Sequence, residues 1–275
     1  MNDELMEKTY SEKDLKWSIL LLFGCFCIGF NATIAFHELG HAFAMVLDGV
    51  HIKEFFLNPF SWSWTFPESL NNPLFTAFGG ISFGLLFAIL PSIGTIWIRS
   101  AYFRIPAFIT AAFAFAINGI YLVAGTFFKV GDGGELIQYG ISQILILSLG
   151  SLYLIVALIF LAVIQPLLGI NKNISIVKRF LIFGAGIIPY LLMIFLYNLL
   201  LNKKEILLWF SFVLAGVLLI LLLSIVGYFW ARMHKEFCEI NRSKVGWGPV
   251  IMALILGFVI IIGELIIFGV KENPF

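Results

Sequence analysis

Long apolar stretches dominate the pattern of this chain and predict helices that cross a membrane. Seven stretches reach the roughly 20 residues that a helix needs to span the hydrocarbon of a bilayer. The first and the fourth are longer than this, so we expect them to tilt, protrude or break. The predicted spans cover residues 17–47, 72–98, 104–128, 134–165, 179–201, 205–230 and 248–270.

A shorter, alternating pattern follows the first span. Within residues 52–66, aromatic residues alternate with Ser and Thr in a period of two, which is typical of a strand. Asn58-Pro59 marks a turn in this segment. We therefore expect a short interfacial hairpin, with Trp62 and Trp64 as candidate anchors in the headgroup region. An irregular aromatic loop is the alternative that the pattern leaves open.

Composition agrees with a membrane protein. Hydrophobic residues make up 61% of the chain and charged residues 12%, against about 25% charged residues in soluble domains. The fold class that we expect is an all-α polytopic membrane protein, a bundle of about six to seven transmembrane helices with the short interfacial hairpin after the first span. A net charge of +1 gives no reason to expect a nucleic-acid partner.

The remaining composition signals concern redox chemistry and targeting. The three cysteines are odd in number and two lie in the first span, so neither a disulfide framework nor a cysteine zinc site is indicated. The polar residues 1–16 carry charges of both signs, unlike a secretory signal, and we expect no cleaved signal peptide. We expect a multi-pass protein of the cell (plasma) membrane, in contact with the lipid bilayer.

The sequence His37-Glu38-Leu39-Gly40-His41 lies inside the first apolar span. Ionisable side chains are costly in hydrocarbon, so we expect these to face the protein interior and to have a function. Helical spacing places His37 and His41 on one face, where both imidazoles can reach one Zn²⁺. Glu38 can then act as general base on a metal-bound water. Histidines that are only hydrogen-bonded to neighbouring helices are the alternative, but the desolvation cost of three such groups in one turn favours a metal.

A catalytic zinc site usually has three protein ligands. The His-x-x-Gly-x-x-His extension of soluble zinc proteases is absent, because Ala44 and Leu47 occupy its positions. Asp48 lies two turns after His41, about 10 Å along the helix, which is too far. Asp132 lies in a Gly-rich break after the third span, and parallel first and third spans bring it to the same membrane face as the histidines. An ordinary interfacial turn is the alternative for this segment.

These motifs together resemble the site-2 protease family of intramembrane zinc metalloproteases. The matching stretches are residues 36–42, the following segment 49–55, and Gly131-Asp132-Gly133-Gly134. The resemblance covers about residues 17–165 and implies that His37, His41 and Asp132 bind Zn²⁺ and that Glu38 is the general base. It also implies that the substrates are membrane-embedded or membrane-proximal proteins.

Two segments depart from the family pattern. The Asn-x-x-Pro segment expected about eight residues before the ligand aspartate is absent, and Ala124 stands at its position. The Gly-Pro-x-x-Asn segment of the second helix is replaced by residues 78–82. Asn118 is the nearest asparagine before Asp132 and is a weak candidate for binding substrate. The family's metal-binding motifs are thus matched better in this chain than its substrate-binding segments, as expected of a divergent branch of the family.

Three functions are compatible with these observations. The first is an intramembrane zinc metalloprotease. The second is a non-proteolytic membrane protein that retains the metal site for transport, binding or partner regulation. The third is a hydrolase of a lipid or another small amide. Glu38 favours an enzyme, because a pure binding site has little need of a base beside two His ligands.

The chain divides into a polar leader (1–16), a metalloprotease-like core (17–165) and C-terminal helices of undetermined role (166–275), which include Glu264 within an apolar span. Lys and Arg number 12 on the N-terminal side of the membrane and 5 on the other. The positive-inside rule then places the N-terminus in the cytoplasm and the metal site nearer the outer face. Proteases of the resembled family with the motif on their first helix usually have the reverse arrangement. The sequence does not determine the oligomeric state.

Overall fold

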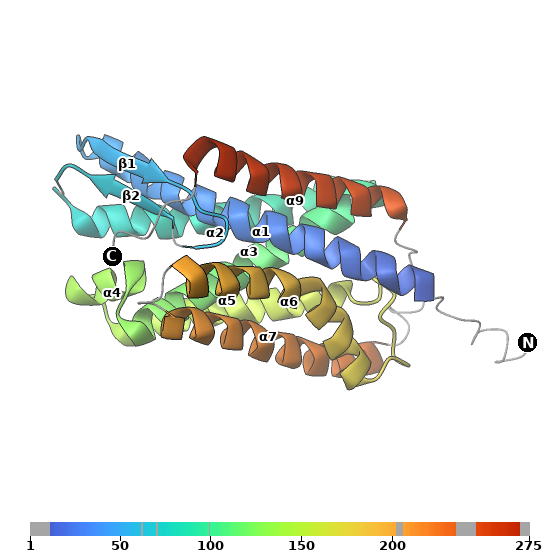
Figure 1. Cartoon of the computed structure of the whole chain (residues 1–275). Coiled ribbons are helices and arrows are strands. Elements are labelled where there is room, and N and C mark those ends of the chain that lie inside the picture. Colours follow the sequence, from blue (N-terminus) through green and yellow to red (C-terminus); the bar gives the residue numbers. More distant parts are fainter. Residues whose placement is uncertain are drawn as a thin grey trace, which may run out of the picture.

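The computed structural model describes residues 12–61, 63–69, 71–98, 100–201, 206–234 and 246–269. Most of these residues form long helices that run along a common direction (Figure 1). The elements are α1 (Glu12–Leu47), β1 (Ile52–Phe56), β2 (Trp64–Pro67), α2 (Pro73–Trp97), α3 (Ala101–Phe128), α4 (Gly131–Gln138), α5 (Gln143–Ile164), α6 (Ile176–Leu201), α7 (Ile206–Met233) and α9 (Trp247–Phe268). The expected all-α architecture is confirmed.

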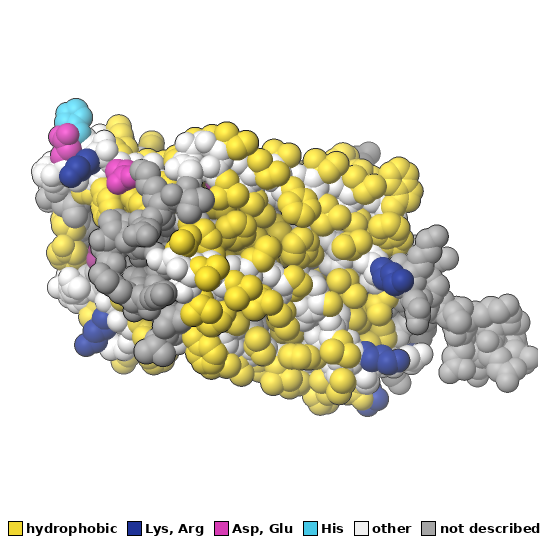
Figure 2. All heavy atoms as spheres, viewed as in Figure 1, with side chains coloured by type: hydrophobic (Ala, Val, Ile, Leu, Met, Phe, Trp, Pro, Cys, Tyr) yellow, Lys and Arg dark blue, Asp and Glu magenta, His cyan; other side chains and the backbone are white. Residues whose placement is uncertain are grey.

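Seven helices of the described residues are long and apolar enough to cross a membrane, which confirms a multi-pass membrane protein. They contain the segments Leu15–Leu47, Pro73–Trp97, Tyr102–Phe128, Gln143–Ile164, Ile176–Leu201, Phe210–Met233 and Trp247–Phe268. In Figure 2, hydrophobic side chains cover the middle of the visible face, and the charged side chains gather toward its two ends. Such a belt is the surface that lipid tails require.

The fourth predicted span, 134–165, is broken near its start, which is one of the outcomes expected from its length. The segment is divided into the short helix α4 and the spanning helix α5, with a turn between them. Gly140 in this turn has φ +86°, a conformation that glycine adopts without steric cost and that ends the helix. The break matters for the site, because it lets α4 take a direction of its own.

The hairpin after the first span is confirmed, and the alternative of an irregular loop is excluded. β1 and β2 pair in antiparallel fashion, and Phe56 lies opposite Trp64 with the two rings stacked at 4.2 Å. Trp64 is buried by this stacking, so the expectation that it anchors the headgroup region was wrong. Trp62, the other expected anchor, lies outside the described residues.

Helix α1 lies at the centre of the bundle and packs against α2, α3, α6 and α9. Figure 1 shows α9 lying along α1, although the two are the first and last helices of the described residues. Their backbones approach closely, since a Cβ on Gly24 of α1 would lie 2.8 Å from the backbone of Ala253. One apolar core contains Leu21, Phe113 and Ile182, so helices before and after residue 165 share it.

Arg179 is buried, unlike Arg104 and Lys178, which are exposed near the same end of the bundle. It is fully buried at the start of α6 and donates hydrogen bonds to Gln165 Oε1 and to the carbonyls of Asn171 and Ile174. These hydrogen bonds hold the connection between α5 and α6 against the start of α6. The charge of Arg179 therefore lies inside the protein and not at its surface. Without it, the Lys and Arg count on this face falls from 12 to 11.

Candidate metal centre

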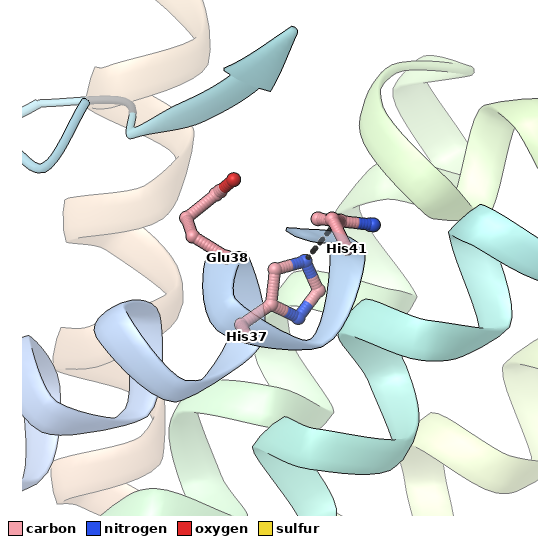
Figure 3. A group of neighbouring side chains, drawn as sticks. All are labelled: His37, Glu38 and His41. Carbon is pink, nitrogen blue, oxygen red and sulfur yellow. Dashed lines mark hydrogen bonds between the residues drawn. The ribbon is translucent and has the colours of Figure 1, made fainter. Parts of the chain in front are cut away.

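The His-Glu-x-x-His segment lies in the last three turns of α1. The Nε2 atoms of His37 and His41 are 3.1 Å apart, and their rings are perpendicular with centroids at 4.7 Å. Glu38 extends from the same turn in another direction, away from the two rings (Figure 3). A ligand atom from each of the three residues lies within 4.8 Å of the other two, so this buried group could hold a metal ion.

Asp132 reaches the two histidines from the first turn of α4. Its Oδ2 atom lies 2.9 Å from His37 Nε2, and its Oδ1 atom lies 3.3 Å from His41 Nε2. The structure thus brings together the three side chains that the sequence placed at one membrane face. Their role as metal ligands remains a prediction.

The Gly-rich segment explains how Asp132 arrives there. Helix α3 ends at Lys129, which has φ 57°, and Gly131 follows with φ 54°, so the chain reverses within three residues. A Cβ on Gly134 would overlap the backbone of Lys129, and one on Gly133 would lie 2.8 Å from Thr126 N. The glycines therefore allow α4 to fold back tightly against the end of α3.

The glycines of α2 form the opposite wall of the centre. A Cβ on Gly80 would overlap the His41 ring and lie 3.0 Å from His37 Nε2. In the same contact, Gly40 of α1 and Gly79 of α2 approach so closely that a Cβ on either would overlap the other residue's carbonyl. This small-residue crossing brings the two helices together and leaves the ligand atoms bounded by backbone.

Hydrogen bonding fixes how His41 faces the centre. Its Nδ1 atom lies 2.8 Å from the carbonyl oxygen of Thr76, which can only accept. Nδ1 therefore carries a hydrogen, and in the neutral ring Nε2 presents its lone pair to Asp132. A second hydrogen bond of this kind is the usual way in which proteins orient a metal-binding histidine.

The charge of Asp132 is strongly favoured at this position. Burial alone would raise the pKa of its carboxyl group, but positive charge on His41 and His37, present when these rings are protonated, outweighs burial and holds the pKa well below its usual range. The buried Oδ2 atom accepts no hydrogen bond of good geometry from the described residues, although His37 Nε2 is close. When the rings are neutral, the Asp132 carboxylate faces the lone pair of His41 Nε2, and a cation between them would relieve this repulsion.

The donor set fits a small divalent ion. The three separations among the histidine nitrogens and the Asp132 oxygens run from 2.9 to 3.3 Å. Ligands at about 2.0–2.1 Å from a tetrahedral ion lie about 3.3 Å apart, so a small adjustment would admit the ion. An oxygen of Asp132 lies within 3.3 Å of each histidine nitrogen, and Glu38 belongs to the same group of close donor atoms, so Asp132 as the third ligand stays a prediction.

Glu38 is held by the hairpin rather than by the metal ligands. Thr65 of β2 lies with its hydroxyl 2.8 Å from Glu38 Oε2 and 3.2 Å from the Glu38 backbone carbonyl. The hydroxyl hydrogen can serve either acceptor, and the carboxylate is the closer one. The sequence analysis missed Thr65, although its place on the polar face of the alternating hairpin pattern was the available signal.

The hairpin loop is in turn held by α6. Asn198 donates to the Phe60 carbonyl at 2.7 Å and accepts from the Ser61 hydroxyl at 2.7 Å. Tyr190 donates either to the Pro59 carbonyl or to Asn31 of α1, both within 3.0 Å. Helix α6 lies outside the predicted metalloprotease-like core, and these contacts give part of the C-terminal segment a structural role at the site.

A cavity adjoins the centre on the side of α3. It encloses about 860 Å³, open space included, and is lined by His37, Glu38, Asn118 and Tyr121 among others. Asn118, the weak candidate for substrate binding, uses its amide to donate to the carbonyls of Gly84 and Ala114. Its side chain therefore joins α3 to α2 at the cavity wall, and a direct role toward substrate stays a prediction.

Glu264 is buried in α9 and does not belong to the group of possible metal ligands among the described residues. No protein-family model matches the chain, and the searches of curated proteins and of solved structures also give no match. The resemblance to the site-2 protease family accordingly rests on the motifs alone. The function is therefore inferred from the geometry of the site.

Proposed function

We propose that this protein is an intramembrane zinc metalloprotease that hydrolyses peptide bonds of membrane-embedded or membrane-proximal proteins. The observation that carries the proposal is the convergence of His37, His41 and Asp132 at one end of a cavity that Glu38 also lines. Metal ligands alone would serve storage or transport. A carboxylate beside them, held by a partner of its own, is the arrangement of hydrolytic zinc sites.

The ligand types favour zinc. Two imidazoles and one carboxylate are a common protein ligand set of catalytic zinc, and three protein ligands leave a fourth position for water or substrate. When bound, the ion would supply a Lewis acid that lowers the pKa of a coordinated water to about 7 and polarises a substrate carbonyl.

Glu38 would act as the proton carrier. Its Oε2 atom is engaged by Thr65, so the second oxygen is the one available to take a proton from water. As the water oxygen forms its bond to the scissile carbonyl carbon, Glu38 accepts the proton. It then delivers this proton to the amide nitrogen, the C–N bond breaks, and a carboxylic acid and an amine leave.

The position of the site favours a peptide that is already in the membrane. The ligands lie near the ends of spanning helices, and the cavity is enclosed by α1, α3, α7 and the hairpin loop. A substrate helix would have to unwind locally, because the carbonyls of a helix are occupied by its own hydrogen bonds. The polar side chains of Ser61 and Ser63 line this cavity and offer partners for the freed backbone groups.

The test compares wild type with Glu38→Gln in vesicles that contain a panel of single-span reporter proteins. Glu38→Gln should retain one zinc per chain by elemental analysis and cleave none of the reporters that the wild type cleaves. Glu68→Gln is the matched control, because Glu68 is exposed beyond β2. Cleavage by Glu38→Gln at the wild-type rate would exclude this mechanism.

A non-proteolytic metal-binding protein is the second candidate, favoured by the absent Asn-x-x-Pro segment and by the use of the Asn118 amide between helices. It predicts that wild type binds zinc and leaves every reporter intact. It also predicts that Glu38→Gln changes no transport or binding property of the metal.

A further inference from the structure

The cavity beside Glu38 is long and follows one face of α1. Phe30, Thr33 and Ile34 line it before His37 and Glu38, with the spacing of residues that share a helix face. From Phe30 to Glu38 the helix rises about 12 Å. The cavity therefore extends from the candidate catalytic groups back toward the middle of the bilayer.

The wall changes in character along this length. Glu38 and, from the hairpin loop, Ser61 and Ser63 contribute polar groups to the wall, whereas Phe30, Ile117 and Phe212 contribute apolar ones. Thr33 and Asn118 also line the cavity, but they donate to backbone carbonyls. The rings of Phe30 and Phe212 meet edge to face at 6.2 Å. A second cavity of about 370 Å³ lies beyond, and Ile117 and Phe212 line both, so these two side chains form the partition.

We propose that this cavity is a specificity pocket that takes one large apolar side chain of the residue next to the scissile bond, and that Phe212 sets the size limit. The inference rests on the proposed function, since it needs a substrate placed against Glu38. A pocket with a polar mouth and an apolar end matches a residue whose backbone lies at the mouth and whose side chain points inward.

The length of the pocket favours a side chain over a lipid tail. One leaflet of a bilayer is about 15 Å of hydrocarbon, and a lipid acyl chain spans it. The residues of α1 that line the pocket span about 12 Å, and part of this lies beside Glu38 itself. A Leu or Phe side chain is shorter than this distance, so it can end before the Phe30–Phe212 contact.

The binding experiment uses the full-length, zinc-loaded protein and small hydroxamates, which chelate zinc without being cleaved. Acetohydroxamate reports the metal alone. N-acetyl-leucine and N-acetyl-alanine hydroxamates, and the corresponding 2-isobutyl- and 2-methylsuccinyl hydroxamates, place a large or a small side chain on either side of the chelating group. Hexadecanoyl hydroxamate represents a lipid chain, and the matched amides without the hydroxyl correct for partition into detergent.

We expect the leucine side chain to bind at least tenfold more tightly than the alanine side chain in one of the two orientations, because three additional carbon atoms are buried. In Phe212→Ala the two cavities should merge into a longer one. The variant should therefore prefer a hydroxamate that carries the longer side chain of 4-phenylphenylalanine. Phe210→Ala is the matched control on the same helix, because Phe210 is 55% exposed to the lipid side and should leave the preference unchanged.

The outcomes separate the two claims. If acetohydroxamate fails to bind, the proposed function fails and this inference with it. If acetohydroxamate binds but side-chain size has no effect in either orientation, or Phe212→Ala keeps the wild-type preference, only the specificity pocket is overturned. Tighter binding of the hexadecanoyl compound than of both isobutyl compounds would also overturn it, in favour of a lipid substrate.

Discussion

The two sides of the candidate site are built by different means. The metal side is held by backbone contacts between helices, with Gly80 against the histidine rings and Gly134 against the end of α3. On the other side, Glu38 is held by a hydrogen bond from Thr65, and the hairpin loop is held by a hydrogen bond from Asn198. A metal needs ligands at fixed separations, whereas a general base has to gain and lose a proton. The comparison suggests that zinc binding and hydrolysis can be separated by substitution.

The largest expected effect is on the metal side. His37→Ala or Asp132→Asn removes one ligand, and we expect zinc affinity to fall at least 100-fold, as measured by competition with a chromogenic chelator. His51→Ala is the control, because His51 is exposed before β1 and should bind zinc like wild type. Equal affinity in Asp132→Asn and wild type would remove Asp132 from the ligand set.

The backbone contacts give the next prediction. Gly80→Ala places a methyl group where the His41 ring lies, so we expect zinc affinity to fall about tenfold or more while the helix content stays unchanged. Gly94→Ala on the same helix meets only one side-chain atom, at 4.0 Å, and should bind zinc normally. If the two variants bind zinc alike, the close wall at Gly80 has no part in shaping the centre.

A smaller effect is expected where Thr65 holds the base. Thr65→Val removes the hydroxyl that donates to Glu38, and a hydrogen bond to a charged group contributes about 1.5–3 kcal/mol. Reporter cleavage should slow roughly 10- to 100-fold by that same measure, with zinc affinity unchanged. Thr65→Ser keeps the hydroxyl and should restore most of the rate. A parallel loss of zinc in Thr65→Val would show that the two sides are not separable.

The smallest effect on the site is expected from α6. Asn198→Ala removes the contacts to Phe60 and Ser61, each worth about 1 kcal/mol, so the loop should exchange its amide hydrogens faster while zinc affinity stays the same. The readout is hydrogen exchange over residues 57–66. Asn173→Ala, at an exposed position before α6, is the control. Unchanged exchange in Asn198→Ala would mean that α6 does not hold the loop.

The bundle and half of the site follow from local patterns in the sequence. Apolar run length predicts the spans, alternation predicts the hairpin, and the spacing of His37 and His41 predicts their common face. The approach of Asp132 follows from counting span directions. These properties depend on neighbouring residues or on topology, which a single sequence displays.

The remaining parts depend on contacts between distant segments. Thr65 and Glu38 are 27 residues apart, and Asn198 lies 137 residues after Ser61. No helical or strand periodicity in the sequence links residues at either of these separations. Gly79-Gly80 was visible as a pair of small residues, but its place against the histidines depends on how α1 and α2 cross. The length of the fourth apolar run indicated a break, but its position was not visible because one glycine turn hardly interrupts the run.

The central claim is that one zinc ion is bound by His37, His41 and Asp132. X-ray absorption spectroscopy at the zinc edge of the purified, zinc-loaded protein tests it most directly. We expect a first shell of nitrogen and oxygen only, at about 2.0–2.1 Å, with the outer-shell scattering of two imidazole rings, and with one ring lost in His37→Ala. A sulfur shell at about 2.3 Å, or fewer than two imidazoles in the wild type, would contradict the account.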